Sequence, residues 1–239
     1  MSKRLIVLWL GLALTSSAAL SEEPSLKFTT GVYAVSGGAL PSSHGLDVNL
    51  RQSSQLGNIW GAWYRSPEAQ VSQPRMGWDN SFDMPRWRVM PSVQIASGGF
   101  MGGSLSVETG ETLFAGVGLG RTNLRPYVNL NFDPNDAWMA SLGYRWSSMQ
   151  SLSMQVVKDN RQNPDQQHLH ALYRSPLPNG QRLTLDLLFK SGRVEERMVH
   201  RTGLSVTYDF SHYFTRIAYD PVINFTPQSM WRVSVGARY

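Results

Sequence analysis

The chain has 239 residues, of which 41% are hydrophobic and 16% are charged, and it carries a formal net charge of +5 and no cysteine. The absence of cysteine excludes a disulfide framework and a thiolate metal site. The small basic surplus is spread along the chain, which argues against a nucleic-acid-binding protein, because such proteins gather basic residues on one face.

The first 19 residues have the form of a secretory signal peptide. Lys3 and Arg4 precede an apolar run from Leu5 to Leu14, and small residues follow at Ser17 and Ala19. The run is too short to cross a bilayer as a helix, so we expect cleavage after Ala19. The mature chain, residues 20–239, would then carry 20 Lys and Arg (22 less the two that are removed) against 17 Asp and Glu, and be only mildly basic.

The mature chain repeats one pattern: apolar and polar residues alternate over stretches of up to about ten residues, and turn-forming residues follow each stretch. Alternation of this kind is typical of strands that are apolar on one face. It predicts fourteen strands, at residues 26–34, 45–53, 58–65, 86–96, 100–108, 112–120, 124–132, 137–146, 150–157, 167–175, 181–190, 199–209, 212–219 and 230–239. Twelve is the alternative if the third strand or the segment 98–103 does not pair.

The connections between these strands fall into two classes. If the first strand starts on the periplasmic side of a membrane barrel, every second connection lies in the periplasm. These connections are short, at residues 54–56, 97–99, 121–123, 147–149, 176–180 and 210–211. Those assigned to the outer side are the longer connections 35–44, 66–85, 158–166, 191–198 and 220–229, with two tight ones at 109–111 and 133–136. Short periplasmic turns and longer outer loops are typical of outer-membrane barrels.

Two prolines, Pro91 and Pro126, fall inside predicted strands. Proline has no amide hydrogen, and a closed barrel has no free edge at which that loss would go unnoticed. We therefore expect bulges at these positions, or strands that begin there.

Candidate catalytic residues lie on the polar face of the predicted strands. A hairpin around residues 176–180 places His170 opposite Asp186, and Ser151 and Ser153 lie on a neighbouring strand. These four side chains are candidates for a nucleophile, a base and an orienting acid. The simpler interpretation is that these polar side chains hydrogen-bond one another on the water-exposed inner face of a barrel. His168 shares the face of His170, but no third metal ligand is evident, so neither a metal site nor a cofactor is predicted.

A basic cluster is predicted inside the barrel near the periplasmic ends of neighbouring strands. It consists of Arg125, Arg145, Arg174 and Arg182. Side chains of like charge repel unless acids, water or anions lie between them. Either acids such as Asp186 and Glu108 neutralise the cluster in a packed interior, or the cluster lines an anion pathway, because rings of Arg or Lys favour anions in pores.

The last strand is the most informative segment. Trp231, Val233, Val235 and the terminal Tyr239 lie on one face of residues 230–239, and polar or small residues lie on the other. This strand resembles the C-terminal strand of a Gram-negative outer-membrane β-barrel. Alternation alone also fits a soluble β-sandwich. The signal peptide, the absence of cysteine and this final strand favour the barrel.

The mature chain therefore resembles an all-β, porin-like outer-membrane barrel, although no motif singles out one family. The resemblance implies contact with outer-membrane lipid and lipopolysaccharide, and insertion by an assembly machinery that recognises the final strand. Three functions are compatible with it: a small passive channel for polar or anionic solutes, an enzyme acting on membrane lipid or exported polysaccharide through His170 and Asp186, and a structural or adhesion barrel without an open pore. Fold alone does not choose between them.

Overall fold

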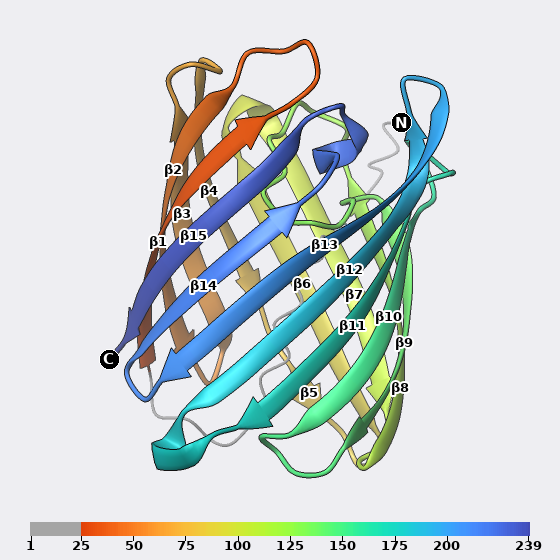
Figure 1. Ribbon diagram of the computed structural model, residues 1–239. Coiled ribbons are helices and arrows are strands. Elements are labelled where there is room, and N and C mark those ends of the chain that lie inside the picture. The colour runs from red at the N-terminus through yellow and green to blue at the C-terminus, as the bar shows by residue number, and fades with distance from the viewer. Residues whose placement is uncertain (1–24) are drawn as a thin grey trace, which may run out of the picture.

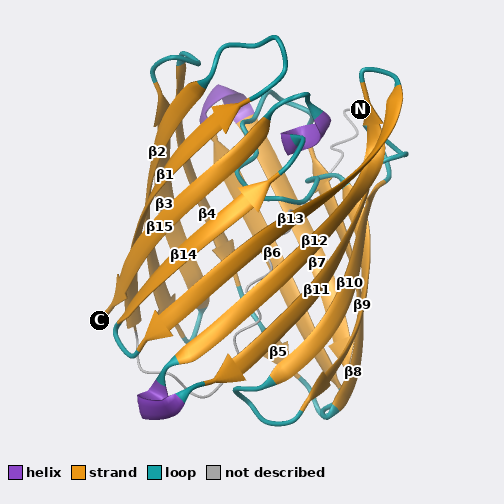
Figure 2. Ribbon diagram, viewed as in Figure 1, coloured by secondary structure: helices purple, strands orange, loops and turns teal. Residues whose placement is uncertain are grey.

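The computed structural model describes residues 25–239, and these residues form one closed antiparallel β-barrel (Figures 1 and 2). The predicted signal peptide lies outside the described residues. Helical structure in the described range consists of three short 3-10 turns, η1 (Ser97–Gly99), η2 (Pro178–Gly180) and η3 (Ile223–Phe225). None of the helices in this range has the length and apolar character needed to span a membrane.

The strands follow one another around the barrel in chain order. They are β1 (Ser25–Ser36), β2 (Ser43–Ser54), β3 (Gly57–Ser66), β4 (Val71–Asp79), β5 (Phe82–Asp83), β6 (Trp87–Ala96), β7 (Phe100–Thr109), β8 (Leu113–Thr122), β9 (Ala137–Arg145), β10 (Ser151–Asp159), β11 (Gln167–Pro176), β12 (Arg182–Val194), β13 (Arg197–Phe210), β14 (Tyr213–Asp220) and β15 (Ser229–Arg238). The barrel closes where β1 pairs with β15.

The wall of the barrel has fourteen strands, as predicted. The two-residue β5 pairs with β6 in the same register as β4 does, so it is an extension of β4 beyond a break at Asn80 and Ser81. Pro91 lies opposite that break: Asn80 donates its backbone N–H to the Pro91 carbonyl at 3.1 Å, and proline offers no donor in return. The amide hydrogen that Pro91 lacks is therefore lost at a point where the pairing of β6 with β4 and β5 is already interrupted.

The two faces of the wall differ in polarity. Apolar side chains such as Val117, Leu142 and Val233 are more than 45% exposed on the outside, whereas Ser104, Thr207 and Ser234 are buried on the inside. A closed barrel satisfies its backbone hydrogen bonds within the sheet, and only such a sheet can expose its sides to lipid. The apolar exterior therefore fits the hydrocarbon core of a membrane.

The predicted assembly signal lies on the strand that closes the barrel. Trp231, Val233 and Val235 of β15 point outward and are 50–53% exposed. Tyr239, which follows β15, exchanges two backbone hydrogen bonds with Leu26 at the start of β1. These residues are therefore accessible from the lipid side, and their recognition by an assembly machinery stays a prediction.

Two of the predicted elements are wrong, one strand and one loop, and the two errors cancel in the strand count. Residues 124–132 are not a strand: Leu124 has a positive φ of 58°, and Pro126 follows it. The predicted loop 66–85 contains a strand, β4. The outward positions of β4 are Ser72, Pro74, Met76 and Trp78, so its apolar face is interrupted and its alternation is hard to recognise.

The errors also reverse the direction of three strands, β6, β7 and β8. We call the end of the barrel where β1 begins and β15 ends the terminal end, and the opposite end the distal end (Figure 1). The connections 97–99 and 121–123, predicted on the periplasmic side, lie at the distal end, and the connection 109–111, predicted on the outer side, lies at the terminal end. The longest connections, 123–136 and 221–228, are both distal.

The revised topology predicts which residues face the cell exterior. Single cysteines at Asn123, Gln162 and Glu196, all at the distal end, should react with a membrane-impermeant maleimide on intact cells. A cysteine at Asn179, in the terminal-end turn, should react only after the outer membrane is permeabilised. Labelling of Asn179 but not Glu196 on intact cells would reverse the orientation of the barrel.

Candidate functional site in the barrel lumen

The connection between β8 and β9 folds into the barrel instead of outward. We call residues 123–136 the inner segment; it appears as the green connection at the distal end in Figure 1. Leu130, only 4% exposed, packs against Tyr33, Tyr64 and Met230, which are buried on the inner face of β1, β3 and β15. The alternation that predicted a membrane strand here instead buries apolar side chains inside the lumen.

Polar contacts fix the inner segment to the wall at several points. The side-chain amide of Gln73, on β4, donates to the Val128 carbonyl at 2.9 Å and accepts from the Val128 N–H at 2.8 Å. Near its C-terminal end, the buried Asp136 accepts hydrogen bonds from the backbone N–H and the hydroxyl of Thr122. The Tyr127 ring stacks on Phe100 of β7 at 4.0 Å between centroids. The segment thus crosses the lumen and contacts opposite walls.

A histidine–carboxylate cluster joins the inner segment to β11. Asp133 Oδ1 lies 2.8 Å from His168 Nδ1 and 2.9 Å from His170 Nε2. The other ring nitrogen of His170 lies 2.9 Å from Asp186 Oδ1 on β12. Burial on its own would raise the pKa of the Asp133 carboxyl, but the charge of His170 and the hydrogen bonds from both imidazoles outweigh burial and hold that pKa well below its usual range.

The predicted His170–Asp186 pair is formed, although the register differs from the prediction. His170 lies directly opposite Leu188, and Asp186 is reached diagonally. Ser153 lies opposite Leu172 on β11, and Ser151 lies opposite Arg174. Within residues 25–239 no hydrogen bond links either serine to His170, whose Nε2 is directed at Asp133. The described arrangement therefore gives the pair no serine nucleophile.

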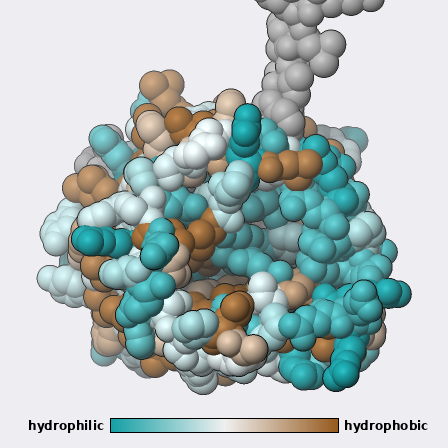
Figure 3. Space-filling model, turned by 90° about the horizontal axis from the view of Figure 1, so that it is seen from above, coloured by the Kyte–Doolittle hydropathy of each residue, from teal (hydrophilic) through white to brown (hydrophobic). Residues whose placement is uncertain are grey.

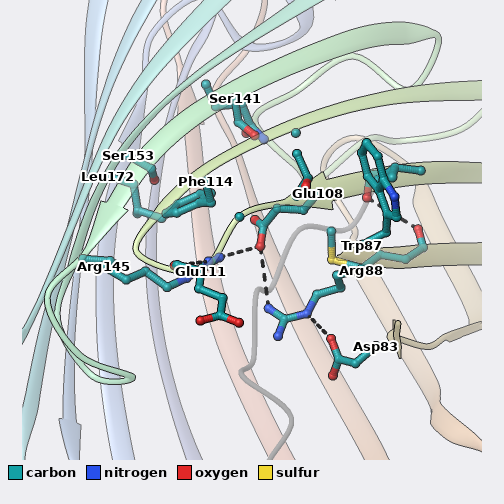
Figure 4. A pocket seen from close by; sticks show the side chains of 18 of the residues that line it. Asp83, Trp87, Arg88, Glu108, Glu111, Phe114, Ser141, Arg145, Ser153 and Leu172 are labelled. Atoms are coloured by element: carbon teal, nitrogen blue, oxygen red, sulfur yellow. Dashed lines mark hydrogen bonds and ion pairs between the residues drawn. The ribbon is translucent and has the colours of Figure 1, made fainter. Parts of the chain in front are cut away.

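A cavity of about 800 Å³ extends along the lumen from the terminal end to the inner segment. Asp83, Arg88, Glu108 and Arg145 line it near the terminal end, and Asp133, His170 and Asp186 line its inner part. Figure 4 shows a chain of ion pairs across this wall: Asp83 with Arg88, Arg88 with Glu108, and Glu108 with Arg145.

One aromatic ring shapes this part of the wall. Phe114, on β8, lies over Gly143 of β9, where a Cβ would collide with the ring. The guanidinium of Arg145 lies over the same Phe114 ring, 3.7 Å from its centroid. Because both the ring and Glu108 hold Arg145, its charge stays at the wall instead of extending freely into the cavity.

Three of the four arginines in the predicted basic cluster lie together. Ser151 pairs with both Arg145 and Arg174 across adjacent strands, and Arg182 follows on β12. The row continues around the terminal end, because Arg238, Lys27 and Arg51 lie directly opposite one another on β15, β1 and β2. We call these six residues the basic arc.

Three acids form ion pairs with four members of the basic arc. Arg51 pairs with Asp79 at 3.1 Å, Arg145 with Glu108 at 2.5 Å, and both Arg182 and Arg238 with Asp209. Asp209 is shared by two arginines, so these pairs contain one more basic side chain than acids. Arg216, one step further into the lumen on β14, donates a hydrogen bond to the Thr207 hydroxyl.

Arg125 does not belong to this cluster, contrary to the prediction. It lies in the inner segment at the distal end and is exposed. Its assignment to the periplasmic end followed from the strand predicted at residues 124–132, which does not exist.

The sequence did not reveal the residues that join the inner segment to the barrel wall. Asp133 lies in a stretch interpreted as a tight outer turn, and Gln73 lies in a stretch interpreted as an outer loop. Their contacts with His168, His170 and Val128 join residues 35 to 55 positions apart. The two prolines at 126 and 134 were the available signal that this stretch leaves the sheet.

Comparison with known proteins identifies the fold but no family. Neither a protein-family model nor a curated protein matches the sequence. The outer membrane protein Omp33 of Acinetobacter baumannii matches the structure with a TM-score of 0.52 at 9% identity, over 90% of this chain and 98% of that chain. The NanC porin (TM-score 0.48, 10% identity, 89% and 98% covered) and a mutant of the Rh. blastica porin (0.47, 8%, 91% and 99%) are also similar. The porin-like barrel predicted from the sequence is confirmed, and it agrees with a location in a Gram-negative outer membrane.

Proposed function

We propose that this protein is a small passive channel of the outer membrane that favours polar and anionic solutes. The observation that carries the proposal is the basic arc at the terminal end of a barrel with an 800 Å³ lumenal cavity. Arginines that outnumber the acids beside them raise the local concentration of anions around an opening. Figure 3, a view onto the distal end, shows hydrophilic side chains along the right side of a central hollow and hydrophobic ones at its left and lower rim.

The outer face of the barrel indicates which membrane components the protein would contact. The apolar outer face would contact membrane lipid, with lipopolysaccharide in the outer leaflet, and the closing strand β15 would carry the signal for the assembly machinery. We do not favour an enzyme, because the Nε2 of His170 faces a carboxylate of the inner segment.

The selectivity test neutralises three neighbouring members of the basic arc. The variant R145Q/R174Q/R182Q should move the reversal potential in a salt gradient away from anion preference, because the positive field at the terminal end is reduced. The effect should shrink near physiological salt, where the Debye length is about 8 Å. Planar-bilayer recording of refolded protein measures it.

Arg125→Gln is the control for position, because it removes one arginine charge from an exposed site at the other end of the barrel. Its reversal potential should stay close to that of the wild type. A triple variant that remains as anion-selective as the wild type would refute the role of the basic arc, and a wild type that conducts no ions would refute the channel.

A further inference from the structure

We propose that Asp133, His168 and His170 form a binding site for one divalent transition-metal ion of the zinc class, and that this ion fastens the inner segment to the barrel wall. The inference does not depend on conduction through the lumen. It rests on the kind, the placement and the surroundings of the three ligand atoms.

The three donor atoms converge on one point. Asp133 Oδ1, His168 Nδ1 and His170 Nε2 all lie within 4.8 Å of one another. Ligands about 2.0 to 2.2 Å from a tetrahedral zinc ion are roughly 3.3 Å apart, so small side-chain shifts would place an ion between these atoms. Two imidazoles and one carboxylate form a donor set that zinc, cobalt and nickel accept, and a fourth position is left for water.

The wall orients one of these ligands as metal sites do. The Nδ1 of His170 is 2.9 Å from the Asp186 carboxylate, which leaves Nε2 for the metal. A carboxylate behind a ligating histidine fixes the orientation of the ring and raises its basicity as a ligand. Asp186 is therefore a positioning residue for the site.

Burial and charge also fit a divalent cation. His168 is 1% exposed and His170 is 7% exposed, so the histidine ligands are shielded from bulk water. The carboxylates of Asp133 and Asp186 together balance two positive charges. The nearest cation on the neighbouring strand, Lys190 opposite His168, is already paired with Asp220 at 2.7 Å.

The placement of the ligands gives the ion a structural consequence. Asp133 comes from the inner segment, whereas His168 and His170 come from β11. Binding would therefore join the segment that crosses the lumen to the wall by coordination bonds instead of hydrogen bonds. Removal of the ion would leave the weaker link that the hydrogen bonds provide.

The test uses the refolded mature chain, purified without a histidine tag and treated with EDTA. Addition of Co²⁺ should produce the visible absorption bands of a four-coordinate complex with one ion per chain, and Zn²⁺ should abolish these bands by displacement. Asp133→Asn and His168→Ala should each weaken binding by more than tenfold. Asp186→Asn should weaken it by roughly 10- to 100-fold, as loss of a partner behind the ligand does.

His44→Ala is the matched control, because His44 and Glu68 form an exposed histidine–carboxylate pair that no third metal ligand joins among residues 25–239. This variant should bind Co²⁺ as the wild type does. Heat-modifiable migration in gels shows which variants are folded, and Zn²⁺ should raise the temperature of that transition for the wild type but not for Asp133→Asn. A wild type without the Co²⁺ bands, or an Asp133→Asn variant that retains them, would overturn the proposal.

Discussion

Replacing residues 125–132 by a glycine–serine linker of equal length is expected to raise the single-channel conductance severalfold. The replaced residues include Leu130 and Val128, which pack on or bond to the inner faces of β1, β3, β4 and β15. A glycine–serine linker has no apolar side chain to bury and makes none of these contacts, so nothing holds it inside the lumen. The cross-section available to ions at the distal half should then be set by the wall alone.

The control replaces another distal connection, residues 37–42, which is exposed throughout and projects from the distal end between β1 and β2 (Figure 1). Its conductance should match that of the wild type, and planar-bilayer recording compares the three proteins. Both variants retain all fourteen wall strands, so both should show the heat-modifiable migration of a folded barrel. An unchanged conductance in the first variant would mean that the inner segment does not limit the pore.

The sequence was sufficient to predict the barrel because the wall is built from local pattern. In β8, for example, Leu113, Val117 and Leu119 face outward while Gly116 and Gly118 face inward, and a period of two residues reveals both faces at once. Lumenal charge follows from the same parity: Arg145, Arg174, Arg182 and Asp186 all point inward as expected. These features can be predicted without knowing which strands pair with one another.

The inner segment could not be predicted in this way, because apolar alternation has the same form whether it faces lipid or fills a lumen. Leu124, Val128, Leu130 and Phe132 alternate like a membrane strand, yet Leu130 is buried against Tyr33 and Tyr64. What decides the outcome is the shape of the space left by the other strands, which no local stretch contains. The site made by Asp133 with His168 and His170 depends on that same long-range placement.

The buried pair of Lys190 and Asp220 is expected to have the largest effect on stability. Lys190 Nζ lies 2.7 Å from Asp220 Oδ1 and also donates to the Val222 carbonyl at 3.2 Å, and both side chains are at most 2% exposed. Lys190→Met would leave the Asp220 carboxylate buried without its partner. Loss of one member of a buried pair costs about 3 to 5 kcal/mol, so the free energy of unfolding should fall by this amount.

Two further variants separate the pair from a general effect of charge removal. In K190M/D220L both charges are removed together, and most of the lost stability should return, since an apolar replacement of a buried ion pair is often neutral. Arg193→Met breaks an exposed pair with Asp165, whose side chains are 65% and 47% exposed, and should cost less than about 1 kcal/mol. Urea unfolding of the refolded barrel in lipid vesicles, followed by tryptophan fluorescence, measures all three. If Lys190→Met and Arg193→Met lose equal stability, the buried pair does not hold β12 to β14 and the connection that follows it.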